Sequence, residues 1–377
     1  MIRPTWSGRL AHDLQNRGLS AWLLCGALWT FYVVLYFGVP YTHPQGGLES
    51  FQAWLYQNAT LHLDAWGARL SFGRDEGHIY RGDRWTLYAL LYTLAMAIGG
   101  AWMFHRYAHN RYQVVRTACV LSVQVSFAFA VPILLKFFGH PEYYFSYLWP
   151  LKIEYLDPRN FAYFGEALVL YAFAASLIVT PLLGVFYGKR WYCSWVCGCG
   201  GLANTFGEPW RHLSQKSARA WAVEKVSVYA VLVVALASTT LWFTASWFPQ
   251  DSTLAAWADT TRTYYGLIVV AALSGAIGTA LYPIGGTRVW CRYFCPMAAM
   301  LGLIQRAGRF RIRVKRDMCI SCGLCTKYCE MGIDVRAYAQ RNEDFVRAAC
   351  VGCGLCEEVC PRDVLRLENG RITWKRT

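Results

Sequence analysis

The stretch from Cys319 to Pro361 reads CISCGLCTKYCEMGIDVRAYAQRNEDFVRAACVGCGLCEEVCP and holds eight of the fifteen cysteines of the chain. These eight fall into two sets with the same internal spacing, C-x2-C-x2-C-x3-C. Each cysteine of the second set lies 31 positions after its counterpart in the first (350−319, 353−322, 356−325, 360−329). The stretch is therefore a tandem repeat that is defined by its cysteines.

This spacing is the one by which a single segment binds two [4Fe–4S] clusters. Three cysteines on one tight loop can reach three iron corners of one cube, whereas the fourth begins the next segment and ligates the other cluster. Zinc sites more often use two separated C-x2-C pairs, and disulfide scaffolds belong mainly to small secreted domains. We therefore predict one cluster bound by Cys319, Cys322, Cys325 and Cys360, and a second bound by Cys350, Cys353, Cys356 and Cys329.

One residue departs from the repeat. The second set is followed by Pro361, as in bacterial sequences of this kind, but the first is followed by Glu330. We expect this carboxylate to change the exit of the loop and the reduction potential of the nearer cluster, and to leave the ligands unchanged.

The composition of the rest of the chain indicates a membrane protein. Of 377 residues, 55% are hydrophobic, 16% are aromatic and only 16% are charged. The formal net charge of +14 is explained by basic loops beside an anionic membrane surface, so no nucleic-acid partner is predicted. The many cluster-type cysteines place their part of the chain in a reducing compartment.

Six apolar stretches free of charged side chains are long enough to cross a bilayer, which takes about 20 helical residues. With the N-terminus inside, the inner segments 1–20, 105–116 and 188–225 hold twelve Lys and Arg, against seven in the outer loops 39–84, 138–166 and 249–263. This bias favours a topology with both termini inside. The six predicted spans are 21–38, 85–104, 117–135, 167–187, 226–248 and 264–283.

A second set of cysteines lies in a longer repeat. GKRWYCSWVCG at 188–198 aligns without a gap with GTRVWCRYFCP at 286–296, at an offset of 98. Each motif follows a predicted span that runs inward, so spans three and four repeat as spans five and six. Parallel repeats are related by an axis along the membrane normal, which would bring the two C-x3-C pairs face to face at the inner surface.

Four thiolates are the number that a further iron–sulfur cluster needs. Cys193, Cys197, Cys291 and Cys295 are therefore the candidate ligands of a third centre, with Arg190 and Arg288 placed to offset its negative charge. A soft-ion site, a dithiol pair in each half and purely structural thiols are the alternatives.

A weaker candidate site is the pair His105 and His109, which lie four residues apart where the second predicted span ends. On a helix they would share a face and could bind haem or a quinone head group. The alternative is a polar, positively charged helix end.

From about residue 164 onward, the spans, the paired C-x3-C motifs preceded by Gly-x-Arg and the cysteine-rich tail resemble the polyferredoxin-type membrane iron–sulfur proteins. That group includes NapH, the C-terminal part of NosR, MauN and CcoG (FixG). One departure is Cys197-Gly198, where the group usually has Cys-Pro, as in Cys295-Pro296. The resemblance implies electron transfer between the quinone pool or a membrane partner and a redox partner.

The predicted architecture is an α-helical membrane domain of about six transmembrane helices with a parallel internal repeat (1–307), followed by an α+β bacterial-type 2[4Fe–4S] ferredoxin domain (308–377). We expect an electron-transfer subunit of a larger oxidoreductase complex in the bacterial inner membrane, with the ferredoxin domain cytoplasmic. The expected cofactors are two [4Fe–4S] clusters, with a third iron–sulfur centre and a quinone as candidates.

The alternative function is a CcoG-like copper reductase or assembly factor that uses the C-x3-C thiolates. A redox sensor would need a signalling domain, which the sequence does not suggest.

Overall fold

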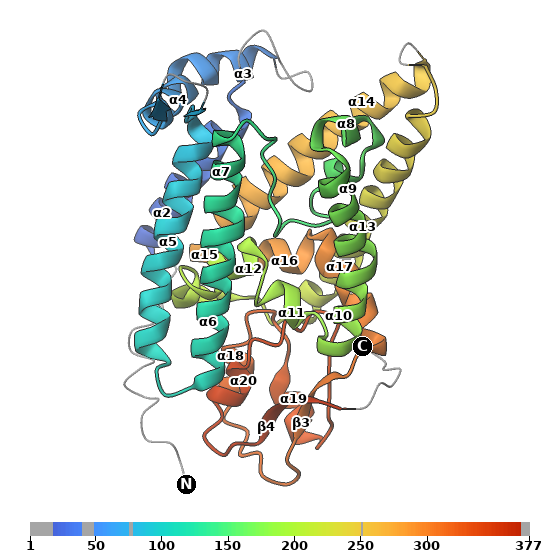
Figure 1. The fold of residues 1–377 in the computed structure, drawn as a ribbon. Helices are drawn as coiled ribbons and strands as arrows, with labels where there is room; N and C mark the ends of the chain where they lie inside the picture. Colours follow the sequence, from blue (N-terminus) through green and yellow to red (C-terminus); the bar gives the residue numbers. More distant parts are fainter. Residues whose placement is uncertain (1–17, 40–48, 75–77, 250–251, 371–377) are drawn as a thin grey trace.

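A computed structural model describes residues 18–39, 49–74, 78–249 and 252–370 of the chain. Long helices stand side by side in one layer, and a small part with two strands lies at one end of them (Figure 1). Between the two lie short helices from the middle of the chain (Figure 1). The fold thus has a helical part, an end domain and a connecting layer.

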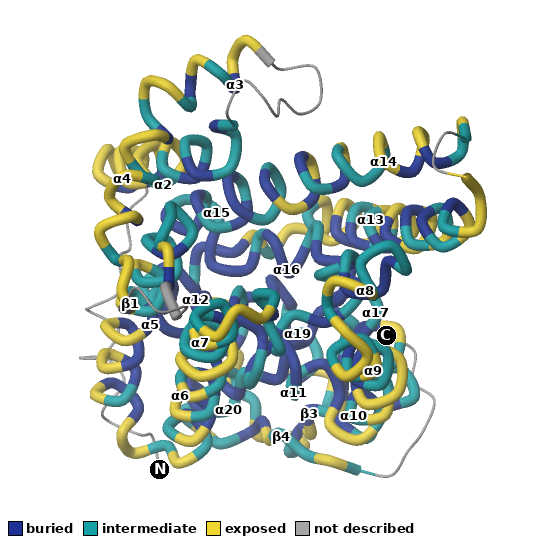
Figure 2. Tube along the Cα trace, turned by 45° about the horizontal axis from the view of Figure 1, so that its top comes forward, coloured by how far each residue is buried: buried dark blue, intermediate teal, exposed yellow. Residues whose placement is uncertain are grey.

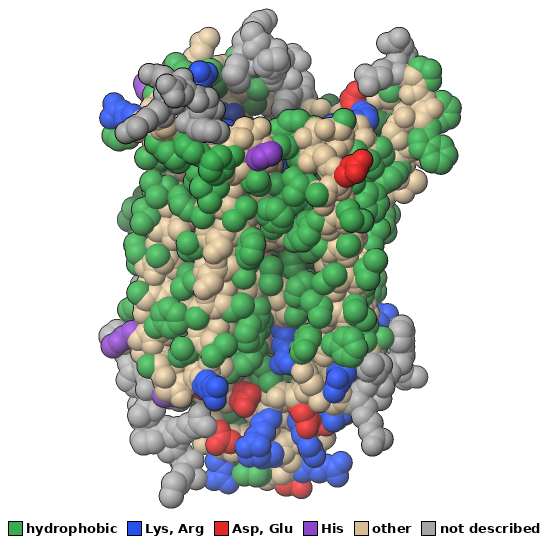
Figure 3. Space-filling view, in the orientation of Figure 1, with side chains coloured by type: hydrophobic (Ala, Val, Ile, Leu, Met, Phe, Trp, Pro, Cys, Tyr) green, Lys and Arg blue, Asp and Glu red, His purple; other side chains and the backbone are tan. Residues whose placement is uncertain are grey.

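Five helices in the described chain are long and apolar enough to cross a membrane. Most of their residues are exposed or half-buried, and hydrophobic side chains cover the face of the helical part that Figure 3 shows, while Lys, Arg, Asp and Glu gather at the end domain. Such a surface suits lipid on the sides and water at the end. The five are Leu19–Phe37 (α2), Arg84–Arg106 (α5), Arg111–Phe137 (α6, η2 and α7), Glu166–Tyr187 (α9, η5 and α10) and Ala218–Ala245 (α13).

The sixth predicted span falls in a continuous helix made of α14 (Thr253–Tyr265) and η7 (Gly266–Thr279), which is not among these five. Its first half carries Arg262 and several threonines, which lower its hydropathy. The helix crosses the others at a steep angle (Figure 1) and packs against α2 through η7. The fold therefore contains a helix at each of the six predicted places, and the number of spans stays a prediction.

Two of the long helices change pitch before a proline. η2 (Gln124–Ala130) precedes α7 (Val131–Phe137), and η5 (Ala174–Val179) precedes α10 (Thr180–Tyr187), with a proline in the first turn of each α segment. Proline has no N–H and clashes with the carbonyl four residues back. A π-helical turn shifts that carbonyl, so each helix continues past its proline.

Short helices in the connecting layer carry the C-x3-C motifs. α11 (Arg190–Cys193) is followed by α12 (Gly198–Asn204) and η6 (Glu208–Leu213), and α15 (Tyr282–Gly285) is followed by α16 (Val289–Tyr293), α17 (Pro296–Ile304) and η8 (Gln305–Ala307). This layer is largely buried in Figure 2, whereas the outer helices are exposed on their outer faces.

The end domain is built on an antiparallel pair of strands, β3 (Phe310–Val314) and β4 (Leu365–Asn369), in which Ile312 pairs with Leu367. Between them lie three short helices: α18 (Leu324–Lys327), α19 (Val335–Gln340) and α20 (Leu355–Glu358). The inward side chains Phe310, Ile312 and Val314 are almost fully buried. The two-stranded sheet therefore closes the domain by bringing its two ends together.

The loop predicted between the first two spans is structured where the structure describes it. It contains α3 (Glu49–Leu55), η1 (Tyr56–Thr60), α4 (Leu61–Ala68) and a small hairpin of β1 (Phe72–Arg74) and β2 (His78–Tyr80). The corresponding long loop after α7 contains η3 (Ile153–Leu156), η4 (Pro158–Asn160) and α8 (Phe161–Phe164).

Candidate functional site: three sets of cysteines

The two cysteine loops of the end domain have the same backbone. Gly323 and Gly354 adopt left-handed conformations, with φ of 77° and 81°, and begin α18 and α20. Only glycine reaches such φ values without strain. The sulfur atoms of Cys329 and Cys360 each accept a hydrogen bond from the backbone N–H four residues on, at 3.4 and 3.3 Å. Hydrogen bonds of this kind tune iron–sulfur potentials.

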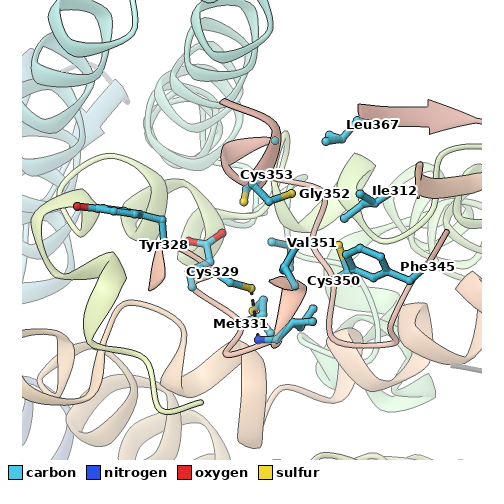
Figure 4. Close-up of a pocket in the computed structure, with 15 residues that line it drawn as sticks. Ile312, Tyr328, Cys329, Met331, Phe345, Cys350, Val351, Gly352, Cys353 and Leu367 are labelled. Carbon is cyan, nitrogen blue, oxygen red and sulfur yellow. Dashed lines mark hydrogen bonds between the residues drawn. The ribbon is translucent and has the colours of Figure 1, made fainter. Parts of the chain in front are cut away.

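One cavity, of about 410 Å³, is lined by Cys329, Cys350, Cys353 and Cys356. Figure 4 shows three of these cysteines around it, together with apolar side chains such as Ile312 and Val351. The four are the set that the sequence assigned to the second cluster. A cavity with four thiols and an apolar wall fits a [4Fe–4S] cluster, which needs four thiolate ligands and shielding from water.

A second cavity, of about 350 Å³, is lined by Cys319, Cys322, Cys325 and Cys360, the set assigned to the first cluster. Cys322 is exposed, and the neighbouring Ile320 is 54% exposed. The two cavities therefore differ in position: this one lies near the surface of the end domain, and the other is turned toward the helices.

The second loop is attached to the helical part by hydrogen bonds from three different side chains. Tyr112 donates its hydroxyl to the carbonyl of Gly352 at 2.7 Å, and Gln113 donates its amide to the carbonyl of Cys353 at 2.8 Å. Ser194, from the first C-x3-C motif, donates to the carbonyl of Val351 at 2.7 Å. The loop that holds three cysteines of the inner cavity is thus docked directly on α6 and on the connecting layer.

The two C-x3-C motifs fold alike. Cys193 ends α11 and Cys197 is the N-cap of α12, just as Cys291 lies in α16 and Cys295 is the N-cap of α17. The N–H of Cys197 donates to the carbonyl of Tyr192 at 2.8 Å, and the equivalent bond from Cys295 to Trp290 is 3.0 Å. The members of each pair therefore lie on two short helices joined by a turn, with the second cysteine at the start of the second helix.

All four of these cysteines are at least nine-tenths buried and lie in one apolar core. Arg288 links the two motifs, because its Nη1 lies 3.4 Å from the carbonyl oxygen of Cys193 and 3.8 Å from the sulfur of Cys291. Burial raises the pKa of Cys193 to about 12 and that of Cys295 well above its usual value. Without a metal Cys193 and Cys295 keep their protons, whereas metal binding would replace the protons.

Cys199 adds a fifth thiol to this group. It forms a side-chain hydrogen bond with Cys197, which lowers the pKa of Cys197 to about 7 despite its burial. Cys199 has no counterpart in the second motif. All fifteen cysteines of the chain are free, so the structure joins no pair of them as a disulfide.

A buried network of charges lies between the C-x3-C cysteines and the inner cavity. Glu330 pairs with Arg211 at 2.9 Å and with Arg288 at 3.1 Å. Arg211 also pairs with Glu208 at 2.7 Å, and Glu208 accepts a hydrogen bond from Tyr107. Burial opposes ionisation of Glu330, but the two arginines outweigh it and hold its pKa down to about 2. The carboxylate beside Cys329 is therefore charged.

Asn204 joins the same network through its side-chain oxygen, which accepts hydrogen bonds from Arg288 at 2.9 Å and from Arg116 at 3.3 Å. With three arginines and two glutamates, all buried, the network has a formal charge of +1. Nothing local in the sequence marks its members, which come from four separate segments. The sequence singled out only Glu330, because it departs from the cysteine repeat, and Arg288, because it precedes the second C-x3-C motif. Arg190 lies apart from the network: it contacts the ring of Phe310 and Asn369 instead.

The histidine pair is not brought together on one helix. α5 ends at Arg106, so His109 lies beyond the helix that carries His105. His109 Nε2 contacts Glu358 of the end domain at 2.5 Å. The structure thus gives His109 a part in domain docking.

A group of polar side chains gathers beside Cys197 within the helices. Tyr92 donates to the side-chain oxygen of Gln124 at 3.2 Å, and Gln124 donates to the carbonyl of Val196 at 2.5 Å. A Cβ on Gly198 would lie 2.5 Å from the Tyr147 hydroxyl and 2.7 Å from both Tyr92 and Gln124. Three polar groups thus converge on the residue after Cys197, in an otherwise apolar part of the molecule.

Family comparisons agree with this division of the chain. The 4Fe-4S dicluster domain family matches residues 312–367. The 4Fe-4S binding domain family matches at 169–217 and 266–315, and each match covers most of the last span and the C-x3-C motif of one half of the predicted repeat. The chain therefore contains iron–sulfur domains of the ferredoxin type.

Three bacterial proteins are similar to this chain at 25–27% identity. MauN of Paracoccus denitrificans, a methylamine utilization ferredoxin-type protein, is 27% identical over 41% of this chain and 54% of its own length. YccM of Escherichia coli, whose name assigns it provisionally to electron transport, is 25% identical over 45% of this chain and 50% of its own. The regulatory protein NosR of Pseudomonas aeruginosa is 25% identical over 43% of this chain and 22% of its own.

The matches to MauN and NosR confirm the predicted resemblance to the polyferredoxin-type iron–sulfur proteins, and they support a role in electron transfer. The matched segment spans about half the length of the first relatives. No solved structure matches the chain.

Proposed function

We propose that this protein is a membrane-bound relay that carries electrons between a quinone and a redox partner protein through three iron–sulfur centres. The observation that carries the proposal is the order of the three cysteine sets. The C-x3-C set is buried next to the helices, the inner cavity of the end domain docks on it, and the outer cavity is near the surface. Cubane clusters pass electrons one at a time, and such an order forms a path from lipid to solvent.

The third centre, at the C-x3-C cysteines, is the one that the ferredoxin cysteine spacing does not account for. Its support is that two segments 98 residues apart fold alike and bring two buried cysteines each into the same core. Arg288 and the net positive charge of the buried network would offset the negative charge of a thiolate-bound cluster. Without a centre here, an electron would have to cross from the quinone between the helices to the inner cavity in one step.

The polar group beside Cys197 is the place that we assign to the quinone. Tyr92, Gln124 and Tyr147 offer donors and acceptors for its carbonyl oxygens, and the surrounding helices offer an apolar wall. His109 contacts Glu358 of the end domain, and His105 lies on another segment, so we assign the quinone to this polar group and not to the histidine pair. A quinol releases two electrons and two protons, and each cluster accepts one electron.

Copper reduction by the C-x3-C thiolates is the competing function. The same four buried thiols would hold the copper ion, so this function and the relay rest on the same residues. Nothing in the geometry therefore favours this function over the relay, and copper analysis of the purified protein distinguishes the two.

The function is tested by electron exchange with a quinone. Anaerobically reduced full-length protein, freed of reductant, is mixed with a short-chain quinone in liposomes, and cluster oxidation is followed by absorbance. We expect rapid oxidation of the wild type and slow oxidation of Gly198→Ala, in which the added methyl group would clash with the oxygens of Tyr147, Tyr92 and Gln124 and displace them. Gly26→Ala is the matched control, because its Cβ would meet nothing within 4 Å.

A second oxidant and the two possible outcomes separate the quinone site from the relay as a whole. Ferricyanide, which reacts at the exposed cluster, should oxidise both variants at the wild-type rate. If Gly198→Ala reacts with quinone as fast as Gly26→Ala does, the assigned quinone site is wrong. If the wild type itself fails to exchange electrons with quinones, the relay has another membrane partner.

A further inference from the structure

A third cavity, of about 780 Å³ and open to solvent, lies where the helical part meets the end domain. It is formed by the first turns of α13, by α17 and by the segment 347–349 that precedes the inner cysteine loop. Neither the iron–sulfur centres nor the quinone site uses it. Its charged lining residues are Lys189, Glu224, Lys225, Arg292, Arg306 and Arg347.

The cavity has a large excess of positive charge. Its five cations face a single carboxylate, that of Glu224, which is already paired with Arg292 at 2.7 Å. Lys225 and Arg347 both lie over the ring of Trp221, at 3.7 and 4.0 Å. Within the described chain, neither forms an ion pair with an acidic side chain. Two cations held close to one indole, with no acidic side chain to balance them, attract an anion.

The other lining residues are apolar and lead toward the lipid-facing surface. Val228 and Tyr229 follow Lys225 on α13, and Ala298 and Ala299 line the cavity from α17. The outward residues of α13 beyond this point are strongly exposed, as Val233 is at 63%. Trp221 and Lys225 stand at the boundary where the apolar part of α13 begins, which is the usual place of tryptophan and lysine at a membrane surface.

A ligand that fits this site carries a negative group at one end and an apolar chain at the other. We propose that the cavity binds the phosphate head group of an anionic phospholipid, with the acyl chains along α13 and α17. Basic pockets between helices at the inner surface bind such head groups. This inference rests on the membrane location in the proposed function, but not on the electron relay.

The bound lipid would brace the two parts of the molecule. Arg347 comes from the end domain and Lys225 from the helical part, so one phosphate between them joins both. Lys189 already makes a similar link by donating to the carbonyl of Ala348 at 2.9 Å. The cysteine loop that begins at Cys350 follows directly.

The test compares the full-length wild type with Lys225→Gln/Arg347→Gln in nanodiscs of phosphatidylcholine, with and without phosphatidylglycerol. Bound phosphatidylglycerol is measured by mass spectrometry after extraction into detergent, and thermal unfolding is measured in the nanodiscs. Arg313→Gln/Arg341→Gln is the matched control, because it removes the same charge from exposed positions of the end domain. Iron content is measured on each sample.

We expect the wild type and the control to retain phosphatidylglycerol and to unfold at a higher temperature when it is present. The Lys225→Gln/Arg347→Gln variant should bind it at least about tenfold more weakly, because it lacks two cations that each strengthen binding to an anionic head group. Equal retention by both double variants would overturn the site. The lipid assignment would also be overturned if millimolar inorganic phosphate stabilised the wild type equally in phosphatidylcholine alone, because the cavity would then bind free phosphate. A wild type that retains the lipid but lacks iron, or exchanges electrons slowly, would count against the electron relay and would leave the lipid site standing.

Discussion

At the scale of single residues, Glu330 gives the clearest case of a side chain that acts on a cluster without ligating it. It follows the ligand Cys329, is almost fully buried, and is held between Arg211 and Arg288. A carboxylate with two arginines is stable in such a place, whereas an unpaired one is not. The sequence marked Glu330 as unusual, but its two partners come from segments more than 40 residues away, so the pairing was not predictable.

Replacing Glu330 with Gln should raise the reduction potential of the cluster at Cys329, because loss of a nearby negative charge favours the reduced, more negative state. A unit charge at this range corresponds to a rise on the order of 50–150 mV for a one-electron couple. The measurement is an EPR-monitored redox titration of the full-length protein.

The conservative variant Glu330→Asp serves as the control, since it keeps the charge. The outer cluster, bound by Cys319 and its partners, should change little in either variant. A potential that stays unchanged in Glu330→Gln would show that the buried network does not tune this cluster.

At the scale of elements, the cysteine repeats explain why so much of the site could be predicted. The offset of 31 in the end domain and the offset of 98 in the helical part are properties of the sequence, and the structure gives equivalent backbone bonds to equivalent residues. Contacts between elements were harder to foresee. The polar group around Gly198 joins Tyr92, Gln124 and Tyr147 from three distant segments, and no spacing in the sequence connects them.

Docking of the end domain should depend on α6, because Tyr112 and Gln113 bind the backbone of the inner cysteine loop. In Gln113→Leu the buried carbonyl of Cys353 loses its donor, which costs about 1–3 kcal/mol. We expect a lower melting temperature and faster proteolysis at the junction, as measured by thermal unfolding and limited trypsin digestion.

Gln340→Leu is the control for this variant, since Gln340 makes its hydrogen bond to Ser321 at an exposed place in the same domain. Equal behaviour of the two variants would mean that the contact with α6 contributes nothing to docking.

At the scale of the whole molecule, the structure has a helix at each of the six predicted places, but the helix that contains the sixth, α14 with η7, crosses the others and is not among the five long apolar helices. Hydropathy predicts which segments avoid water, and it says little about how a helix tilts, because tilt follows from packing against neighbours. The proposed boundary at residue 308 falls just before β3, which begins at Phe310. The cytoplasmic position of the end domain stays a prediction.

Topology can be measured with reporter fusions after Gly188 and after Thr377. Both sites should report the cytoplasm, because the basic segments 105–116 and 188–225 and the end domain lie together, and cluster thiolates need a reducing compartment. A fusion after Ser246, at the opposite end of α13, should report the periplasm. A periplasmic signal at either of the first two sites would overturn the proposed topology.

In the proposed relay, the two halves of the repeat together hold one further iron–sulfur centre between the helices and the end domain. Its most direct test is the iron content of full-length protein purified without oxygen. We predict about twelve iron atoms per chain in the wild type and in the control Cys119→Ala, and about eight in Cys193→Ala/Cys291→Ala, with the end-domain clusters intact by EPR. About eight iron atoms in all three proteins would contradict the claim.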